Sequence, residues 1–246
     1  LLAENKLDLG MVSCYEYATR PDKYGILADL SISANGPVGS VFLFSTVPPD
    51  QLSGKLVLLT GQSATSIALV KIVLEKFFHI QPRYAVGDIL TERNYEKKVS
   101  AILAIGDDAL RLKIKNIYPH KLDLADVWRK NTGLPFVFAV FAVREKFIRT
   151  HPETLKKVWQ TLIACRDRGR SRLQEICRQV APRIPMDFDS CYEYLQQIQH
   201  NLGPEHQRAL ELFFTFLIER GEVDKNALPL KFFPENYAHA EEKAID

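Results

Sequence analysis

The order of the expected secondary structure constrains this chain more than any single motif. Strands and helices alternate up to residue 150, and helices dominate after it. The expected strands are short apolar runs at 7–13, 26–32, 38–45, 55–60, 101–105 and 136–143. After residue 150 the apolar spacing predicts amphipathic helices at 152–181, 189–202 and 204–220. Alternation of this kind is typical of α/β folds, in which helices cover a largely parallel sheet.

Two breaker segments predict that the chain crosses between lobes. Prolines interrupt the chain at 46–49, and a turn enters a long β-prone run at 134–143. We therefore expect lobe one to contain residues 1–45 and 140–246, and an inserted lobe two to contain 50–135. A ligand cleft is expected between the lobes, since domain interfaces are preferred binding positions. The helix-forming entry LLAENK further suggests that a first strand of lobe one precedes Leu1.

Composition excludes several function classes. The net charge of +2 gives no field that would attract nucleic acid or an anionic membrane, and no apolar run approaches the roughly 18 residues of a membrane span. Neither the four cysteines nor the six histidines have metal-ligand spacing, so we expect no metal site. Cysteines without a disulfide pattern favour a reducing compartment, and we expect a cytoplasmic protein.

The first polar motif is SISANGPVGSV, which enters the expected strand at 38–45. Gly36 and Gly39 allow a tight turn or a close approach of the backbone to a ligand. Ser40 follows them at the mouth of the strand, where its hydroxyl can reach a cleft. The alternative interpretation is a plain glycine turn with solvated serines.

The second motif is TGQSATS, at the junction between a strand and a helix. Ser63, Thr65 and Ser66 suit the N-cap and first turn of the helix. Free N–H groups and the helix dipole make such a position favourable for an anion. Ordinary capping explains one of these hydroxyl groups well and three of them less well.

The third motif is IGDDAL, which follows another buried strand. One of its carboxylates, Asp107 or Asp108, can cap the next helix, and the other can act as a general base or accept a hydrogen bond from a substrate hydroxyl. The alternative is one capping aspartate and one solvated aspartate.

Taken in order, the segments LDLGMVS, DLSISANGPVGSV, GKLVLLTGQSATS, AILAIGDDAL and TGLPFVFAVFAV resemble the chorismate dehydratases of the futalosine route to menaquinone. The resemblance extends weakly through CYEYLQQIQHNLG and LELFFTFLIERG. It implies a two-lobed fold like that of type II periplasmic binding proteins, here with extra C-terminal helices.

The resemblance also implies a lyase reaction in which chorismate loses water and becomes 3-[(1-carboxyvinyl)oxy]benzoate. It implies no cofactor and no metal, and a small-molecule substrate as the partner. The implied catalytic residues are Ser40 and Asp107, although the enolpyruvyl carboxylate of the substrate is an alternative proton acceptor. The implied substrate-binding residues are Ser13, Gly39, Ser63, Ala64, Thr65, Ser66 and Asp108.

Two other functions compete with this interpretation. One is 1,4-dihydroxy-6-naphthoate synthase of the same pathway, although GPVGSV and GDDAL fit the dehydratase better. The other is a non-catalytic receptor that closes on a small organic anion. Ser40→Ala should reduce turnover in an enzyme and only affinity in a receptor.

Overall fold

The structure is a computed structural model that describes residues 1–87, 99–183 and 186–234. The described chain forms two compact units. Unit 1 contains Leu1–Ser33, Phe136–Ile176 and the described residues from Gln199 onward. Unit 2 contains Cys177–Ile198 and the described residues between Ala34 and Pro135.

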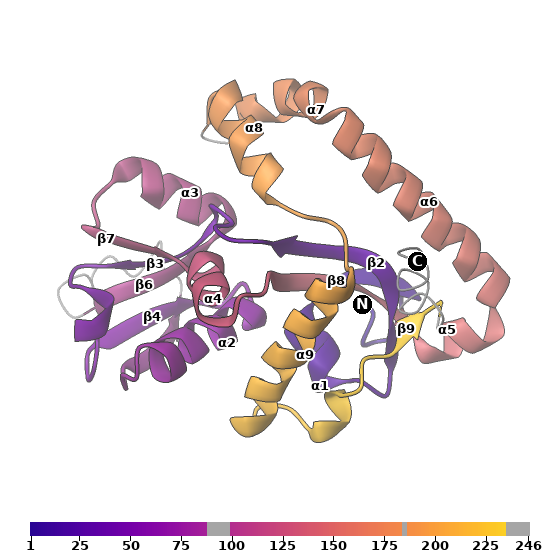
Figure 1. Cartoon of the computed structure of the whole chain (residues 1–246), viewed down its shortest axis with the longest axis horizontal. Coiled ribbons are helices and arrows are strands. Elements are labelled where there is room, and N and C mark those ends of the chain that lie inside the picture. Colours follow the sequence, from indigo (N-terminus) through magenta and orange to yellow (C-terminus); the bar gives the residue numbers. More distant parts are fainter. Residues whose placement is uncertain (88–98, 184–185, 235–246) are drawn as a thin grey trace. The chain divides into compact units, whose positions relative to one another are not determined.

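Unit 1 is built on a four-stranded sheet with the order β1-β8-β2-β9 (Figure 1). Its strands are β1 (Leu9–Ser13), β2 (Tyr24–Ala34), β8 (Phe136–Arg144) and β9 (Phe232–Phe233). Its helices are α1 (Cys14–Thr19), α5 (Glu145–Thr150), α6 (Pro152–Ser171) and α9 (Pro204–Glu219). β1 runs antiparallel to β8, β2 runs parallel to β9, and both α1 and α9 pack on β8.

The core of unit 1 forms where β2, β8 and α6 meet. Leu27, Val143 and Leu155 are fully buried there, together with Leu30. Trp159 lies one helical turn after Leu155, packs on the same cluster, and donates its indole N–H to the carbonyl of Ala28 at 2.9 Å. The apolar spacing of α6 therefore serves to cover this sheet.

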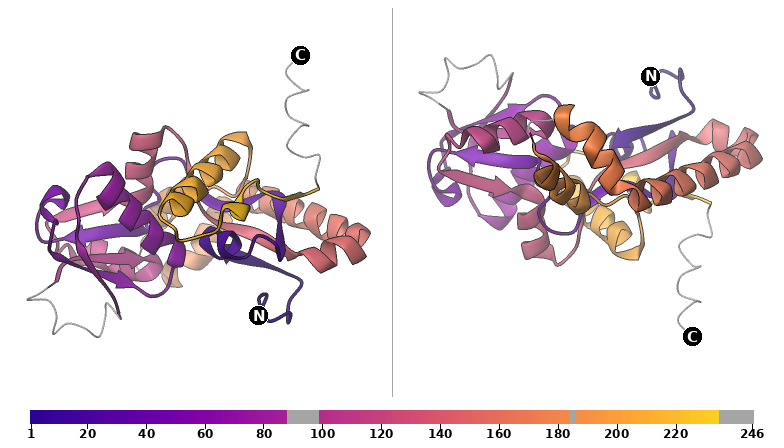
Figure 2. Two further views of the ribbon diagram at one scale, coloured as in Figure 1. Left: turned by 90° about the horizontal axis from the view of Figure 1, so that it is seen from below. Right: turned by 90° about the horizontal axis from the view of Figure 1, so that it is seen from above.

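Unit 2 contains a five-stranded sheet with the order β5-β4-β6-β3-β7. Its strands are β3 (Val41–Ser45), β4 (Leu56–Thr60), β5 (Arg83–Gly87), β6 (Val99–Ile105) and β7 (His120–Asp123). β5, β4 and β6 are mutually parallel, whereas β3 runs antiparallel to both of its neighbours. Figure 2 shows the same sheet from two further sides.

The helices of unit 2 mostly follow its strands directly. They are α2 (Ala64–Ile72), α3 (Gly106–Lys115), α4 (Leu124–Thr132) and α8 (Phe188–Gln197), and a π-helical turn, η2 (Val73–Phe77), extends α2. α7 (Leu173–Val180) begins in unit 1 and ends in unit 2. Short 3-10 turns occur at η1 (Pro49–Gln51), η4 (Ala181–Arg183) and η5 (Lys225–Ala227).

β3 is an interior strand of this sheet, and all five of its residues are buried. Phe42 and Phe44 pack with Ala104 of β6 and Ala109 of α3. A strand covered on both faces should carry apolar residues without alternation, and VFLFS has that pattern.

Most expected elements are confirmed, with two corrections. Residues 1–6 form turns and not a helix, with the N–H of Lys6 bonded to the carbonyl of Leu1 and a positive φ of 60° at Asn5. The single helix expected at 152–181 is two helices, because the backbone leaves helical geometry at Arg172 (φ −116°, ψ 23°). Among the helices described, none combines the length and apolar character that a membrane span requires.

One passage of the described chain between the units, at Pro135–Phe136, falls within an expected crossing, and the others do not. The units exchange at Ser33–Ala34, Pro135–Phe136, Ile176–Cys177 and Ile198–Gln199. The expected crossings were 46–49 and 134–143. The first lies within unit 2, since β3 pairs with β6 and β7. The lobe boundaries and the ligand cleft stay predictions, and residues 235–246 of the expected lobe one lie outside the described residues.

Candidate functional site

The sheet of unit 2 brings most of the expected site residues to one edge. β4, β6 and β7 all end at this edge and β3 begins there, because Val41 pairs with Ile105 and Phe42 pairs with Asp123. The loops that carry the three polar motifs therefore emerge together. Ligands of open α/β sheets bind outside the carboxyl ends of the strands, so this edge is the candidate site. It collects Gly39, Ser40, Ser63, Ala64, Thr65, Ser66, Asp107 and Asp108.

The glycine turn at this edge has the geometry that the sequence predicts. Gly36 and Gly39 have positive φ angles of 111° and 76°, which glycine adopts without the steric cost that other residues incur. The N–H groups of Val38 and Gly39 donate to the carboxylate of Asp123, at 3.2 and 2.8 Å. The turn is thus held by a residue that lies at the end of β7.

Asp123 is a site residue that the sequence analysis missed. Its Oδ1 also accepts from the N–H groups of Ala125 and Asp126 and so caps α4. Burial raises the pKa of Asp123, while its four backbone N–H donors act in the opposite direction. An aspartate placed directly before the amphipathic segment LADVWRK was a readable N-cap signal.

Ser40 is nine-tenths buried, with 6 % of its surface exposed. The hydroxyl of Tyr194 in α8 donates to Ser40 Oγ at 3.1 Å. The carbonyl of Ser40 accepts from the N–H of Gly106, at the start of α3, at 2.8 Å. Two helices that lie far apart in the sequence therefore fix this residue.

The N-terminus of α2 uses part of its polar cluster for capping. Ser63 Oγ accepts from the N–H of Ser66 at 3.2 Å and donates to Ser66 Oγ at 3.1 Å. Thr65 is buried, and Ala64 is exposed at the first helical position. The first N–H groups of a helix have no acceptor within the helix, so the backbone here suits a carboxylate.

The two aspartates of the third motif lie in the first turn of α3. The N-cap of this helix, Ile105, supplies no capping side chain. Asp107 is exposed, and Asp108 accepts from the side-chain amide of Gln62 at 3.3 Å. That bond links the loop before α2 to α3. Neither aspartate is the N-cap, so the expectation of a capping aspartate at this motif is wrong.

Ser13 lies in unit 1, apart from the other expected residues. It is the N-cap of α1, and its hydroxyl accepts from the N–H of Glu16 at 3.1 Å.

Two other serines of the first motif have structural partners. Ser31 and Ser33 are buried in β2, where Ser31 Oγ donates to the carbonyl of Asn201 at 2.5 Å and Ser33 pairs with Gln199 in a β-bridge. They hold the chain segment that precedes α9.

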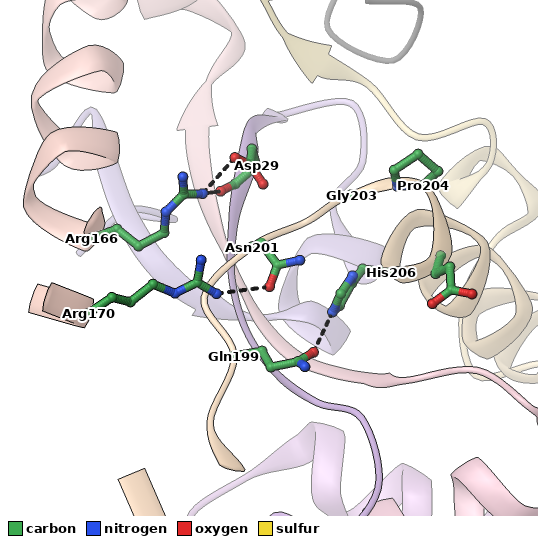
Figure 3. A pocket seen from close by; sticks show the side chains of 9 residues that line it. Asp29, Arg166, Arg170, Gln199, Asn201, Gly203, Pro204 and His206 are labelled. Carbon is green, nitrogen blue, oxygen red and sulfur yellow. Dashed lines mark hydrogen bonds and ion pairs between the residues drawn. The ribbon is translucent and has the colours of Figure 1, made fainter. Parts of the chain in front are cut away.

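Unit 1 contains a separate polar pocket of about 520 Å³ (Figure 3). Arg166 donates to the carboxylate of Asp29 at 2.6 Å and to its carbonyl at 2.7 Å. His206 is hydrogen-bonded to Gln199 at 2.9 Å, and burial lowers its pKa, which favours the neutral imidazole. The charges of this pocket are largely compensated internally. None of the expected site residues lines it, so we place the candidate site at the sheet edge of unit 2.

Solved structures with similar backbones share this two-sheet architecture. Protein AF1704 from Archaeoglobus fulgidus superposes with a TM-score of 0.67 at 17 % identity, over 90 % of this chain and 82 % of that one. The periplasmic aliphatic sulphonate binding protein SsuA from Escherichia coli gives a TM-score of 0.63 at 13 % identity, over 92 % and 79 %. The fold is therefore that of the periplasmic-binding-protein class, which confirms the fold class expected from the sequence.

Sequence comparison then defines the family. The model of a family described as menaquinone biosynthesis matches residues 1–219. A chorismate dehydratase of Thermus thermophilus is 32 % identical over an alignment of 230 residues that covers 87 % of this chain and 80 % of that protein. One of Campylobacter jejuni is 30 % identical over 211 residues, 85 % and 74 % of the two chains. The chain belongs to the menaquinone biosynthesis family, as the sequence motifs indicated, and it is an enzyme.

Proposed function

We propose that this chain is a chorismate dehydratase, a lyase that converts chorismate into 3-[(1-carboxyvinyl)oxy]benzoate and water. The observation that carries the proposal is the pair of dehydratase relatives, each similar over most of both chains. The sheet edge of unit 2 supports it with chemistry suited to a dianion: small hydroxyl groups and the N-termini of helices.

The proposed reaction removes a proton and a hydroxide from neighbouring carbons of the substrate ring. The proton leaves the carbon that bears the enolpyruvyl ether, and its bonding electrons form the third double bond of the ring as the adjacent hydroxyl departs. The proton and the hydroxide together account for the water released. Because the product ring is aromatic, the reaction is strongly downhill, and the protein must mainly orient the bonds and exclude other reactions.

The roles assigned to the site follow from its donors. The N-terminus of α2, with Ser63, Ala64, Thr65 and Ser66, binds one substrate carboxylate. Ser40, supported by Gly39, donates to the second anionic or departing oxygen. Asp108 is assigned to the wall of the binding site. The substrate-binding role expected of Ser13 stays a prediction, since Ser13 caps α1 in unit 1.

Two proton acceptors are compatible with this arrangement. Asp107 is exposed in the first turn of α3, and the enolpyruvyl carboxylate of the substrate is the alternative. The variant Asp107→Asn distinguishes the two proton acceptors. If Asp107 is the general base, kcat should fall by about 10²- to 10⁴-fold; if the substrate carboxylate is the base, kcat should change little.

Incubation of the purified chain with chorismate tests the proposal. We expect an enzyme-dependent product that is lighter by one water in the mass spectrum and has the ultraviolet absorption of an aromatic ring. Ser40→Ala should lower kcat by about 100-fold. Ser171→Ala, in an exposed part of α6, is the matched control and should leave kcat unchanged.

Other outcomes distinguish the rival functions. Chorismate that binds and stays unchanged indicates a receptor. Chorismate that neither binds nor reacts contradicts the proposed substrate. None of the four cysteines, all of which lie in the described residues, forms a disulfide, which suits the cytoplasmic location that we propose for the enzyme.

A further inference from the structure

A tyrosine from outside the three polar motifs contacts the expected catalytic serine. Tyr194 lies in α8, 154 residues from Ser40 along the chain, and its hydroxyl is 3.1 Å from Ser40 Oγ. Both residues belong to unit 2. No family resemblance or polar motif of the sequence assigned a role to this tyrosine.

We propose that Tyr194 is a positioning residue that fixes the Ser40 hydroxyl so that its hydrogen points to the substrate. The inference rests on the proposed function, in which Ser40 donates to an anionic or departing oxygen. In this role, the hydroxyl of Tyr194 fixes the direction in which the hydroxyl of Ser40 donates its hydrogen bond.

The direction of the hydrogen bond follows from the acidity of the two hydroxyl groups. The phenol of tyrosine has a pKa near 10 and is a better donor than the aliphatic alcohol of serine. A serine hydroxyl has one hydrogen and two acceptor positions. When Tyr194 donates to Ser40 Oγ, one acceptor position is filled and the hydrogen of Ser40 stays available for a ligand.

The backbone of Ser40 is already fixed by other elements. Asp123 holds the two preceding N–H groups, those of Val38 and Gly39, and Gly106 donates to the Ser40 carbonyl. The remaining freedom of Ser40 is rotation about χ1, and a hydrogen bond from Tyr194 selects one rotamer. If the rotamer of Ser40 is selected before the substrate binds, its hydroxyl can donate a hydrogen bond without reorganisation of the site during the reaction.

Gly39 provides the space that Tyr194 needs. A Cβ atom at position 39 would lie 3.3 Å from Cδ2 of Tyr194 and 3.0 Å from Oε1 of Gln197. Its φ of 76° also disfavours any side chain. A glycine directly before Ser40 therefore serves two purposes: it turns the backbone and it lets α8 approach.

Tyr194→Phe tests the proposal because it removes the hydroxyl and keeps the ring. We expect kcat to fall about tenfold, the typical effect of losing one neutral hydrogen bond, with KM changed by less than about twofold and the melting temperature lowered by no more than about 2–4 °C. In the double variant with Ser40→Ala, the second substitution should have no further effect on kcat. Tyr192→Phe, which alters a ring stacked on Phe188 in the same helix, is the control and should match the wild type.

The outcomes separate this inference from the proposed function. If the wild type converts chorismate and Tyr194→Phe has the same kcat, the positioning role is overturned. Additive effects of the two substitutions on kcat in the double variant also contradict it, because Tyr194 would then act independently of Ser40. A wild type that does not convert chorismate contradicts the proposed function and removes the role of Ser40 with it.

Discussion

Asp123 is the residue on which the geometry of the candidate site most depends. Its carboxylate accepts four backbone N–H bonds, two from the glycine turn before Ser40 and two from the first turn of α4. A single side chain thus ties the loop before β3 to the helix after β7. Short loops at the edge of a sheet keep a fixed geometry when their N–H groups have acceptors of this kind.

The pH dependence of the enzyme should reflect this carboxylate. Since burial raises the pKa of Asp123 above its ordinary value of 3.8, protonation on the acid side should weaken the four bonds and lower kcat. We expect Asp123→Asn to lower kcat about tenfold and to remove this acid limb from the profile of kcat against pH. An acid limb that is unchanged in the variant would assign the titration to another group.

The contribution of Asp123 to folding stability should increase at acid pH, whereas kcat should decrease. A carboxyl whose pKa is raised by folding contributes stability that is fully present below the unfolded pKa and is lost as the pH rises through the folded pKa. Protonation of Asp123 therefore does not itself unfold the protein. The acid loss of kcat should accordingly occur in a range where thermal unfolding shows a folded chain.

At the scale of elements, three helices begin at one edge of the sheet of unit 2, and their N-termini are capped in different ways. Ser63 caps α2 and Asp123 caps α4, whereas α3 begins without a capping side chain. Acidic residues in the first turn, Asp107 and Asp108, interact favourably with the dipole of α3. The helix best prepared for an anionic ligand is therefore α2, which has no acidic residue in its first turn.

Ser63→Ala tests the part played by α2. Loss of the cap should reduce the free energy of unfolding by about 1 kcal/mol and lower the melting temperature by about 2–4 °C. Affinity for chorismate, measured by calorimetry, should also fall, because the first turn loses order. Asp224→Ala removes a comparable cap in unit 1 and should leave affinity unchanged. Equal affinities of the wild type and Ser63→Ala would place the substrate carboxylate elsewhere.

At the scale of the whole molecule, two units each have their own sheet and their own buried cluster. The chain passes between them more than once, so neither unit is a continuous stretch of sequence. The four cysteines are divided between the units, and three of them are buried. Burial, followed by the neighbouring Cys177, raises the pKa of Cys191 to about 11.

Thiol labelling gives a measure of the integrity of both units. With a thiol reagent at neutral pH, exposed Cys165 should react rapidly, whereas Cys14, Cys177 and Cys191 should react only after denaturation. Mass spectrometry of the labelled peptides identifies the sites. Rapid labelling of Cys191 in the folded protein would contradict the burial of this side chain within unit 2.

The sequence by itself determined the local features of this protein. Strand and helix order, the glycine turn and the cap at Ser63 follow from short patterns, because hydrophobic spacing, positive φ and capping depend on residues within one or two turns. The motifs also sufficed to identify the family, and the sheet of unit 2 brought all but one of the nine expected site residues to one edge. The exception, Ser13, lies in the other unit.

Only the tertiary structure decided how distant residues complete the site. Asp123 lies 85 residues from Val38, and Tyr194 lies 154 residues from Ser40. The place of β3 between β6 and β7, and the structural role of Ser31 and Ser33, likewise depend on pairing between distant segments. No local pattern encodes such contacts, since their partners meet only when sheets and helices pack. The sequence therefore specified the donors of the site, and the packing of the sheets and helices specified what holds them in place.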